Sequence, residues 1–163
     1  MQVIKPKKGN DLGVFYEVWD GTTAPDGSGI TFLGTMQEFQ FEESADENVY
    51  DLLGSESGDW EQSSSGKKRW TGSMNGLVTK WASDSIVKTM HDIFAAGDYV
   101  DIYVAEVNRT ATPAPDMSAG KLYFKGTCWI PSNSLPIQAG ADMTLSVSLK
   151  GTGEPTLDVG PEA

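Results

Sequence analysis

The stretch DMTLSVSLK, residues 142–150, alternates strictly between polar and apolar side chains. The apolar set is Met143, Leu145, Val147 and Leu149, and the polar set is Asp142, Thr144, Ser146, Ser148 and Lys150. Successive side chains of a strand point to opposite faces, so this period of two predicts a strand with one buried and one exposed face. Half-buried strands of this kind are typical of antiparallel sheets.

The same period occurs in several other segments, which lie at 12–20, 30–43, 67–80, 98–107 and 121–130. In the last of these segments Cys128 falls on the inward face, where we expect a buried and unreactive thiol. Eighteen glycines and eight prolines indicate many turns and few long helices. The pattern favours a fold that is built mainly from strands.

One segment, DSIVKTMHDIFAA at residues 84–96, has the period of a helix instead. Its apolar stripe consists of Ile86, Met90, Ile93 and Phe94. We expect Ser83 as the N-cap, Asp84 as a favourable acid in the first turn and Gly97 just beyond the end of the helix. The predicted fold is therefore mainly β: an antiparallel β-sandwich or barrel with one flanking α-helix at about residues 84–96.

The length of 163 residues suits a single domain that spans residues 1–163. We expect a mobile N-terminal arm at 1–11 and a mobile C-terminal tail at 152–163. Residues 44–66 show no clean period and carry many carboxylates, which predicts a long acidic loop. A loop of that length inside a small domain is usually functional or disordered.

The composition argues against catalysis, and we expect no enzyme, no cofactor and no metal. The single cysteine and single histidine exclude the usual zinc sites, and no nucleophile motif accompanies His91. The acidic run lacks the spacing of a calcium loop. A net charge of -11 disfavours tight DNA binding, and no segment is long and apolar enough to span a membrane.

The order of the segments resembles a known family, the major tail tube proteins of long-tailed bacteriophages. The similarity covers residues 30–157, and the segments that carry it are KKRWTGSMNGLV, SDSIVKTMHDIFAAGDYVDIYV, GKLYFKGTCWIPS and ADMTLSVSLKGTGEPT. Their shared features are the element order, the short helix before a Gly-Asp turn, and a last strand that leaves through a Gly-x-Gly-x-Pro turn.

This resemblance implies a structural protein of the virion tail that is assembled in the host cytoplasm. Six subunits would form a ring, and rings would stack into a tube that conducts DNA during ejection. The implied partners are other copies, the tape-measure protein and the tail-tip and tail-terminator proteins, with DNA as passing cargo that does not stick and no membrane. Two alternatives stay open: a tube of a secretion or contractile injection system, and a β-sandwich module that binds carbohydrate or another ligand.

The stretch DLLGSESGDWEQSSSGKKRW, residues 51–70, places carboxylates beside a cluster of cations. Complementary charges of this kind can steer one subunit onto another and set their register. The candidate inter-subunit residues are Asp51, Glu56, Asp59, Trp60, Glu61, Lys67, Lys68 and Arg69. The alternative is a solvated loop without a partner. An acidic tube lining would repel DNA, and small polar residues such as Thr71, Ser73 and Ser146 suit a smooth lining, although the sequence leaves open which face would form it.

Overall fold

Eight strands form antiparallel pairs in the computed structural model, which describes residues 12–33, 36–50, 62–79, 81–82, 85–108, 114–116 and 121–157. The strands are β1 (Leu12–Val18), β2 (Thr31–Phe32), β3 (Met36–Tyr50), β4 (Gln62–Leu77), β5 (Val100–Asn108), β6 (Ala114–Pro115), β7 (Leu122–Ser134) and β8 (Thr144–Thr156). The helix is α1 (Ile86–Ala96). The predicted mainly β fold with one flanking helix is confirmed.

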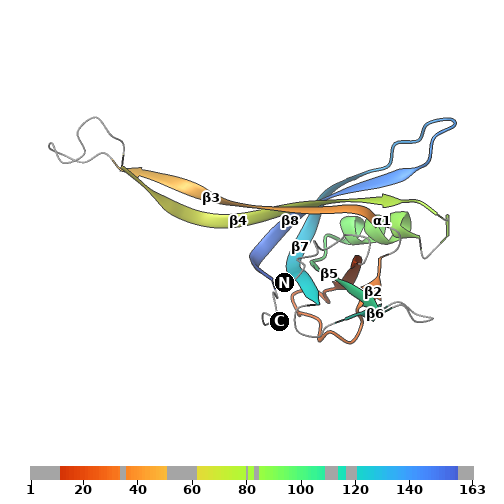
Figure 1. Cartoon of the computed structure of the whole chain (residues 1–163), viewed down its shortest axis with the longest axis horizontal. Coiled ribbons are helices and arrows are strands. Elements are labelled where there is room, and N and C mark those ends of the chain that lie inside the picture. The colour runs from red at the N-terminus through yellow and green to blue at the C-terminus, as the bar shows by residue number, and fades with distance from the viewer. Residues whose placement is uncertain are drawn as a thin grey trace, which may run out of the picture.

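The strand order along the sheet is β2-β1-β5-β7-β8-β4-β3, with β6 added beside β5. This path is open among the described residues, so the strands do not close into a barrel within one chain. Figure 1 shows β3 and β4 crossing the molecule as one long ribbon, with α1 against one side of the sheet. The arrangement leaves part of the β3–β4 ribbon standing clear of the other strands.

The main core lies on one face of the sheet, beneath α1. Strands β1, β4, β5, β7 and β8 contribute alternate apolar residues to it. These include Val14, Met74, Ile102, Phe124, Cys128, Leu145, Val147 and Leu149. The inward faces that the alternation predicted for 67–80, 121–130 and 142–150 are therefore confirmed. A second, smaller cluster covers the opposite face of β5 with Phe15, Tyr103, Ala105 and Leu122, so β5 is buried on both faces rather than one.

Trp70 occupies the middle of the main core and requires glycine on two neighbouring strands. A Cβ atom at Gly151 would lie 2.0 Å from Trp70 Cε2, and one at Gly126 would lie 2.6 Å from Trp70 Cζ2. The indole Nε1 donates a hydrogen bond of 3.2 Å to the Gly153 carbonyl. The indole ring therefore occupies space that a side chain at either glycine would fill.

The helix begins later than the sequence predicted. Its N-cap is Ser85, whose hydroxyl accepts a hydrogen bond of 3.3 Å from the Lys88 backbone N–H, so the expected N-cap at Ser83 is wrong. Both serines precede the apolar stripe, but Ser85 is buried with Ile86 against the core, which fixes the start of the first turn. The helix ends as predicted at Gly97, which has a left-handed φ of 70° and donates to the carbonyls of Ile93 and Phe94.

The long acidic loop predicted at 44–66 is also wrong in its extent. Residues 44–50 continue β3 and residues 62–66 begin β4, and the two strands pair as far as Tyr50 and Gln62. These residues lack a period of two because both faces of the ribbon are exposed there, so no apolar face marks them as strands. Likewise β8 extends through Thr156, so the first residues of the expected tail at 152–163 belong to the sheet. The expected arm at 1–11 lies outside the described residues.

Candidate assembly surfaces

The outer face of the β3-β4-β8-β7 strands carries rows of small polar side chains that face one another in register. One row runs from Gln40 through Ser73 and Ser148 to Ser132, and the next runs from Glu38 through Asn75 and Ser146 to Ser134. Cross-strand partners share a face, so these eight residues form one continuous surface, here called the polar face. The core lies behind it, because the alternate residues Phe39, Met74 and Val147 point inward.

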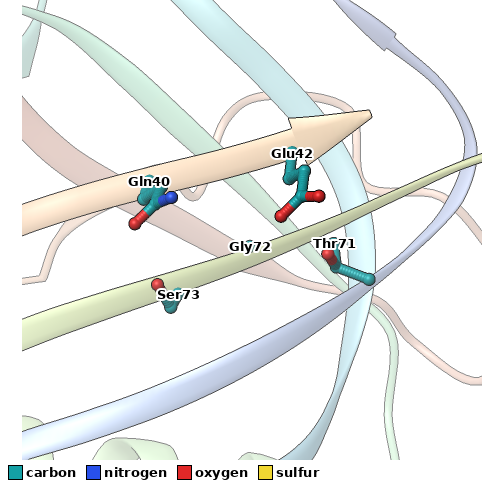
Figure 2. Close-up of a pocket in the computed structure, with 5 residues that line it drawn as sticks. All are labelled: Gln40, Glu42, Thr71, Gly72 and Ser73. Carbon is teal, nitrogen blue, oxygen red and sulfur yellow. The ribbon is translucent and has the colours of Figure 1, made fainter. Parts of the chain in front are cut away.

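A depression on the polar face lies between β3 and β4. Figure 2 shows Gln40 and Glu42 on β3 beside Thr71 and Ser73 on β4, and Gly72 completes the lining. Oxygen atoms dominate this surface and the nearest charge is the Glu42 carboxylate. The depression is therefore polar and weakly acidic. It lacks the apolar walls that pockets for small organic ligands usually have.

Two strand edges on either side of the polar face have no backbone partner among the described residues. On one side, β3 pairs only with β4. On the other side, β5 begins at Val100 opposite Cys128, so the stretch of β7 from Trp129 to Ser134 pairs only with β8. Exposed edges of this kind are templates for pairing with another chain.

The outer parts of β3 and β4, residues 44–50 and 63–69, form a two-stranded ribbon that we call the arm. It extends beyond the last pair between β4 and β8, which joins Thr71 to Lys150. Figure 1 shows the arm reaching away from the rest of the molecule. The residues whose side chains are described along it are exposed or, at Gly66, half-buried. The arm therefore lacks an apolar face of its own.

The structure brings together some of the candidate inter-subunit residues. The Arg69 guanidinium contacts Asp46 across the arm, with 2.5 Å between Nη2 and Oδ1, and both side chains are about half exposed. Lys67 and Lys68 are exposed and make no ion pair among the described residues. The remaining candidates, Asp51, Glu56, Asp59, Trp60 and Glu61, lie outside the described residues. The expected pairing of Lys67 to Arg69 with those carboxylates thus stays a prediction, while Arg69 already has a partner within the arm.

The described residues contain no group of three or more histidine, cysteine, aspartate or glutamate side chains that could hold a metal ion. Cys128 is buried, and its burial, with a smaller contribution from Asp101, raises the pKa of the thiol to about 12. His91 is exposed on α1. Within the described part of the chain, the helix is too short and too polar to cross a membrane.

Two exposed aromatic residues lie where β5 begins, and the sequence pattern did not single them out. Trp129 on β7 and Tyr99 just before β5 are each 38% exposed. The Lys150 ammonium lies 5.8 Å from the Trp129 ring centroid, and Trp19 packs edge-on against Tyr99. The alternation at 121–130 placed Trp129 on the outward face, but only the strand register places it beside Lys150.

No protein-family model matches the sequence, and no curated protein matches it. Solved structures that are similar to the chain in fold include the following three. The tail of an empty gene transfer agent particle, refined with C6 symmetry, aligns with a TM-score of 0.63 at 17% identity over 93% of this chain and 98% of that chain. The SPP1 tail tube aligns with a TM-score of 0.65 at 16% identity over 96% and 80% of the two chains. The anti-feeding prophage baseplate aligns with a TM-score of 0.59 at 7% identity over 94% and 97%. The chain therefore has the fold of the tail tube proteins.

Proposed function

We propose that the protein is a structural subunit of a bacteriophage tail tube. Copies would assemble into hexameric rings, and the rings would stack into a conduit through which DNA is ejected. One observation carries this proposal: a four-stranded polar face bounded by two strand edges that have no partner strand among the described residues, in a chain with the tail tube fold. The same assembly in a contractile injection device is the alternative, supported by the shared fold of the anti-feeding prophage protein.

The two free edges support closure of a ring by strand pairing. The strands of the polar face alternate in direction, and their number is even, so β3 and β7 run antiparallel to each other. A rotation about an axis along the strands keeps strand directions unchanged. The β3 edge of one copy would therefore meet the β7 edge of the next in antiparallel orientation, and the ring would contain no exposed edge.

The polar face suits the lining of such a tube. On β4, β8 and β7 its side chains are exposed serines and the half-buried Asn75, and β3 contributes Gln40 and the Glu38 carboxylate, with Glu42 in the next row. A weakly acidic surface repels phosphate and offers no aromatic platform along its serine rows, so DNA would pass without being held. The opposite face of these strands is the apolar core and is not available for this role.

The arm is proposed as the contact between neighbouring subunits or rings. A two-stranded ribbon without a third strand or an apolar face is marginally stable by itself in water, so it gains most from a partner surface. Its cations Lys67 and Lys68 have no ion-pair partner among the described residues and could pair with carboxylates of another copy. The candidates Asp51, Glu56, Asp59, Trp60 and Glu61 precede them closely in the sequence. Complementary charge there would set the register of stacking.

The remaining proposals follow from this role. The chain would act as a single tail tube domain without catalytic activity, located in the virion tail and assembled in the host cytoplasm. Tape-measure, tail-tip and tail-terminator proteins would contact the assembled tube rather than the monomer. DNA would be cargo, and the tube would need no cofactor.

Electron microscopy of the purified protein at increasing concentration tests the proposal. We expect rings and then tubes of uniform diameter, with a central channel and sixfold symmetry in averaged end views. Assembled tubes should not retard duplex DNA at low salt, because their lining repels phosphate. A protein that stays monomeric at every concentration and salt would contradict the assembly, and strong retardation of DNA would contradict the assigned lining.

A further inference from the structure

We propose that Trp129 and Lys150, with Tyr99 beside them, form the anchor that receives the acidic edge strand β3 of a second copy of this chain. The inference rests on the proposed function and assigns its ring contact to particular side chains. In protein interfaces, a few residues usually carry most of the binding energy, and tryptophan and tyrosine are enriched among them. We expect the same of the contacts that close a ring of subunits.

The first observation is the position of the aromatic rings. Val100, the first residue of β5, pairs with Cys128, so Tyr99 and Trp129 both lie where β5 stops covering β7. Each ring is 38% exposed, although most large apolar side chains on these strands are buried. Trp129 therefore stands at the start of the free edge that runs to Ser134.

The second observation is the charge next to that edge. Lys150 is the cross-strand partner of Trp129, and its ammonium lies 5.8 Å from the Trp129 ring centroid. Such a cation–π contact at an exposed site is weak, so the ammonium keeps its capacity to bind a carboxylate. Lys150 is exposed and makes no ion pair within the described part of the chain.

The third observation is the composition of the opposite edge. Strand β3 carries five exposed carboxylates and no cation, and these are Glu38, Glu42, Glu43, Asp46 and Glu47. Arg69 engages Asp46, but Glu42 lies on the outer face beside the polar depression. One edge of the polar face is thus acidic and the other carries an ammonium and exposed rings, which makes the two edges complementary between copies.

The register selects Glu42 as the matching carboxylate. One cross-strand row runs from Glu42 through Thr71 and Lys150 to Trp129. A neighbour related by rotation about an axis along the strands, without a shift along it, would bring its own Glu42 to the level of Trp129. Lys150 on β8 would be two strand spacings, roughly 10 Å, from the neighbour's β3. The lysine and glutamate side chains together can span that separation across β7.

The molecule contains a matched control for this anchor. Lys125 lies 5.4 Å from the Tyr103 ring centroid on the same outer side of β7, so it makes the same kind of contact. Lys125 and Tyr103 are cross-strand partners within the paired part of β5 and β7, and Tyr103 is buried. This second pair has no free edge beside it and should not contribute to assembly.

The test compares tube formation by wild type, Lys150→Gln and Lys125→Gln at equal concentration, measured as the fraction that sediments and by electron microscopy. We expect Lys150→Gln to raise the concentration needed for assembly by about tenfold or more, and Lys125→Gln to change it by less than about twofold. Equal melting temperatures of the monomers would show that both variants are folded. Equal assembly by the two variants, with wild type forming tubes, would overturn the anchor and leave the proposed function intact.

An exchange of the two charges gives a second, more specific test of the contact between Lys150 and Glu42. Lys150→Glu should prevent assembly, and adding Glu42→Lys to the same chain should restore it, because each contact would again join opposite charges. A failure of the double variant to assemble better than Lys150→Glu would overturn the assignment of Glu42. If wild type itself forms no rings or tubes, the proposed function fails first, so the two failures are distinguishable.

Discussion

The two halves of the β3–β4 ribbon have opposite relations to the rest of the chain. In the inner half, the rings of Phe39 and Phe41 lie 5.3 Å and 4.9 Å from that of Phe124, and Trp70 is 2% exposed. In the outer half, the arm, the described side chains face solvent on both sides. The same two strands thus help to build the core at one end and offer only backbone, hydroxyls and charges at the other. The inner half should determine whether the monomer folds, and the arm should determine what the folded monomer assembles with.

We expect the largest loss of unfolding free energy from Trp70→Ala, which removes a core residue from the inner half of the ribbon. Removing the indole empties the cradle formed by Gly126 and Gly151, and a buried aromatic truncated to alanine typically costs about 3–5 kcal/mol of unfolding free energy. Urea denaturation, followed by circular dichroism, measures the loss.

Trp81→Ala is the matched control, since Trp81 is 69% exposed and should change the unfolding free energy by less than about 0.5 kcal/mol. Similar losses at the two tryptophans would show that the inner half of the ribbon does not hold the core as described.

A smaller effect is expected at alkaline pH from Cys128. Burial raises the pKa of its thiol from 9.0 to about 12, so the folded protein keeps the proton more tightly than the unfolded chain does. This contribution to stability is complete below pH 9 and is lost as the pH rises towards 12. By linkage, the unfolding free energy should fall by about 1–1.5 kcal/mol between pH 8 and pH 10 from this group.

Cys128→Ala should lose that part of the pH dependence while lowering stability at every pH. The raised pKa of Tyr103, also about 12, adds a loss with the same sign that the variant retains. Rapid reaction of the native thiol with a thiol-specific reagent at pH 8, at the rate of the denatured chain, would contradict its burial.

The difference between the inner half of the ribbon and the arm also explains which strands could be predicted from the sequence. Alternation identified the inward faces of β4, β7 and β8, because each packs one face on a continuous core and leaves the other polar. It failed for 44–50 and 62–66, where a ribbon exposed on both faces has no periodic signal although its backbone pairing is regular. Strand structure there is determined by the partner strand rather than by burial.

The burial of two acids, Glu17 and Asp101, could not be predicted from the sequence. Glu17 accepts hydrogen bonds from the backbone N–H groups of Gly27 and Gly29, and Asp101 accepts from Trp19 Nε1 and Thr127 Oγ1. These partners come from other strands and turns, so nothing in the local pattern of residues 12–20 or 98–107 marked either acid as buried. The Trp129–Lys150 contact escaped for the same reason, since it depends on a register that includes an irregularity between Trp129 and Ser132.

The smallest effect on folding, and a large one on assembly, is expected from Lys67→Glu combined with Lys68→Glu. Both cations are exposed on the arm and unpaired within the described residues, and the change spares the contact between Arg69 and Asp46. Exposed charges contribute little to stability, so the unfolding free energy should stay within about 0.5 kcal/mol of wild type.

Tube growth should be lost in the same variant, because the reversed charges would repel the carboxylates of the neighbouring copy. The combination of Lys88→Glu with Lys121→Glu carries the same net charge but changes helix α1 and the residue before β7, so it separates a local contact from general repulsion. This control also removes the ion pairs with Asp92 and Glu106, so its unfolding free energy is measured beside that of the arm variant. Normal tubes from the arm variant would mean that the arm is a solvated ribbon, and a large loss of unfolding free energy would mean that the arm belongs energetically to the folded body after all.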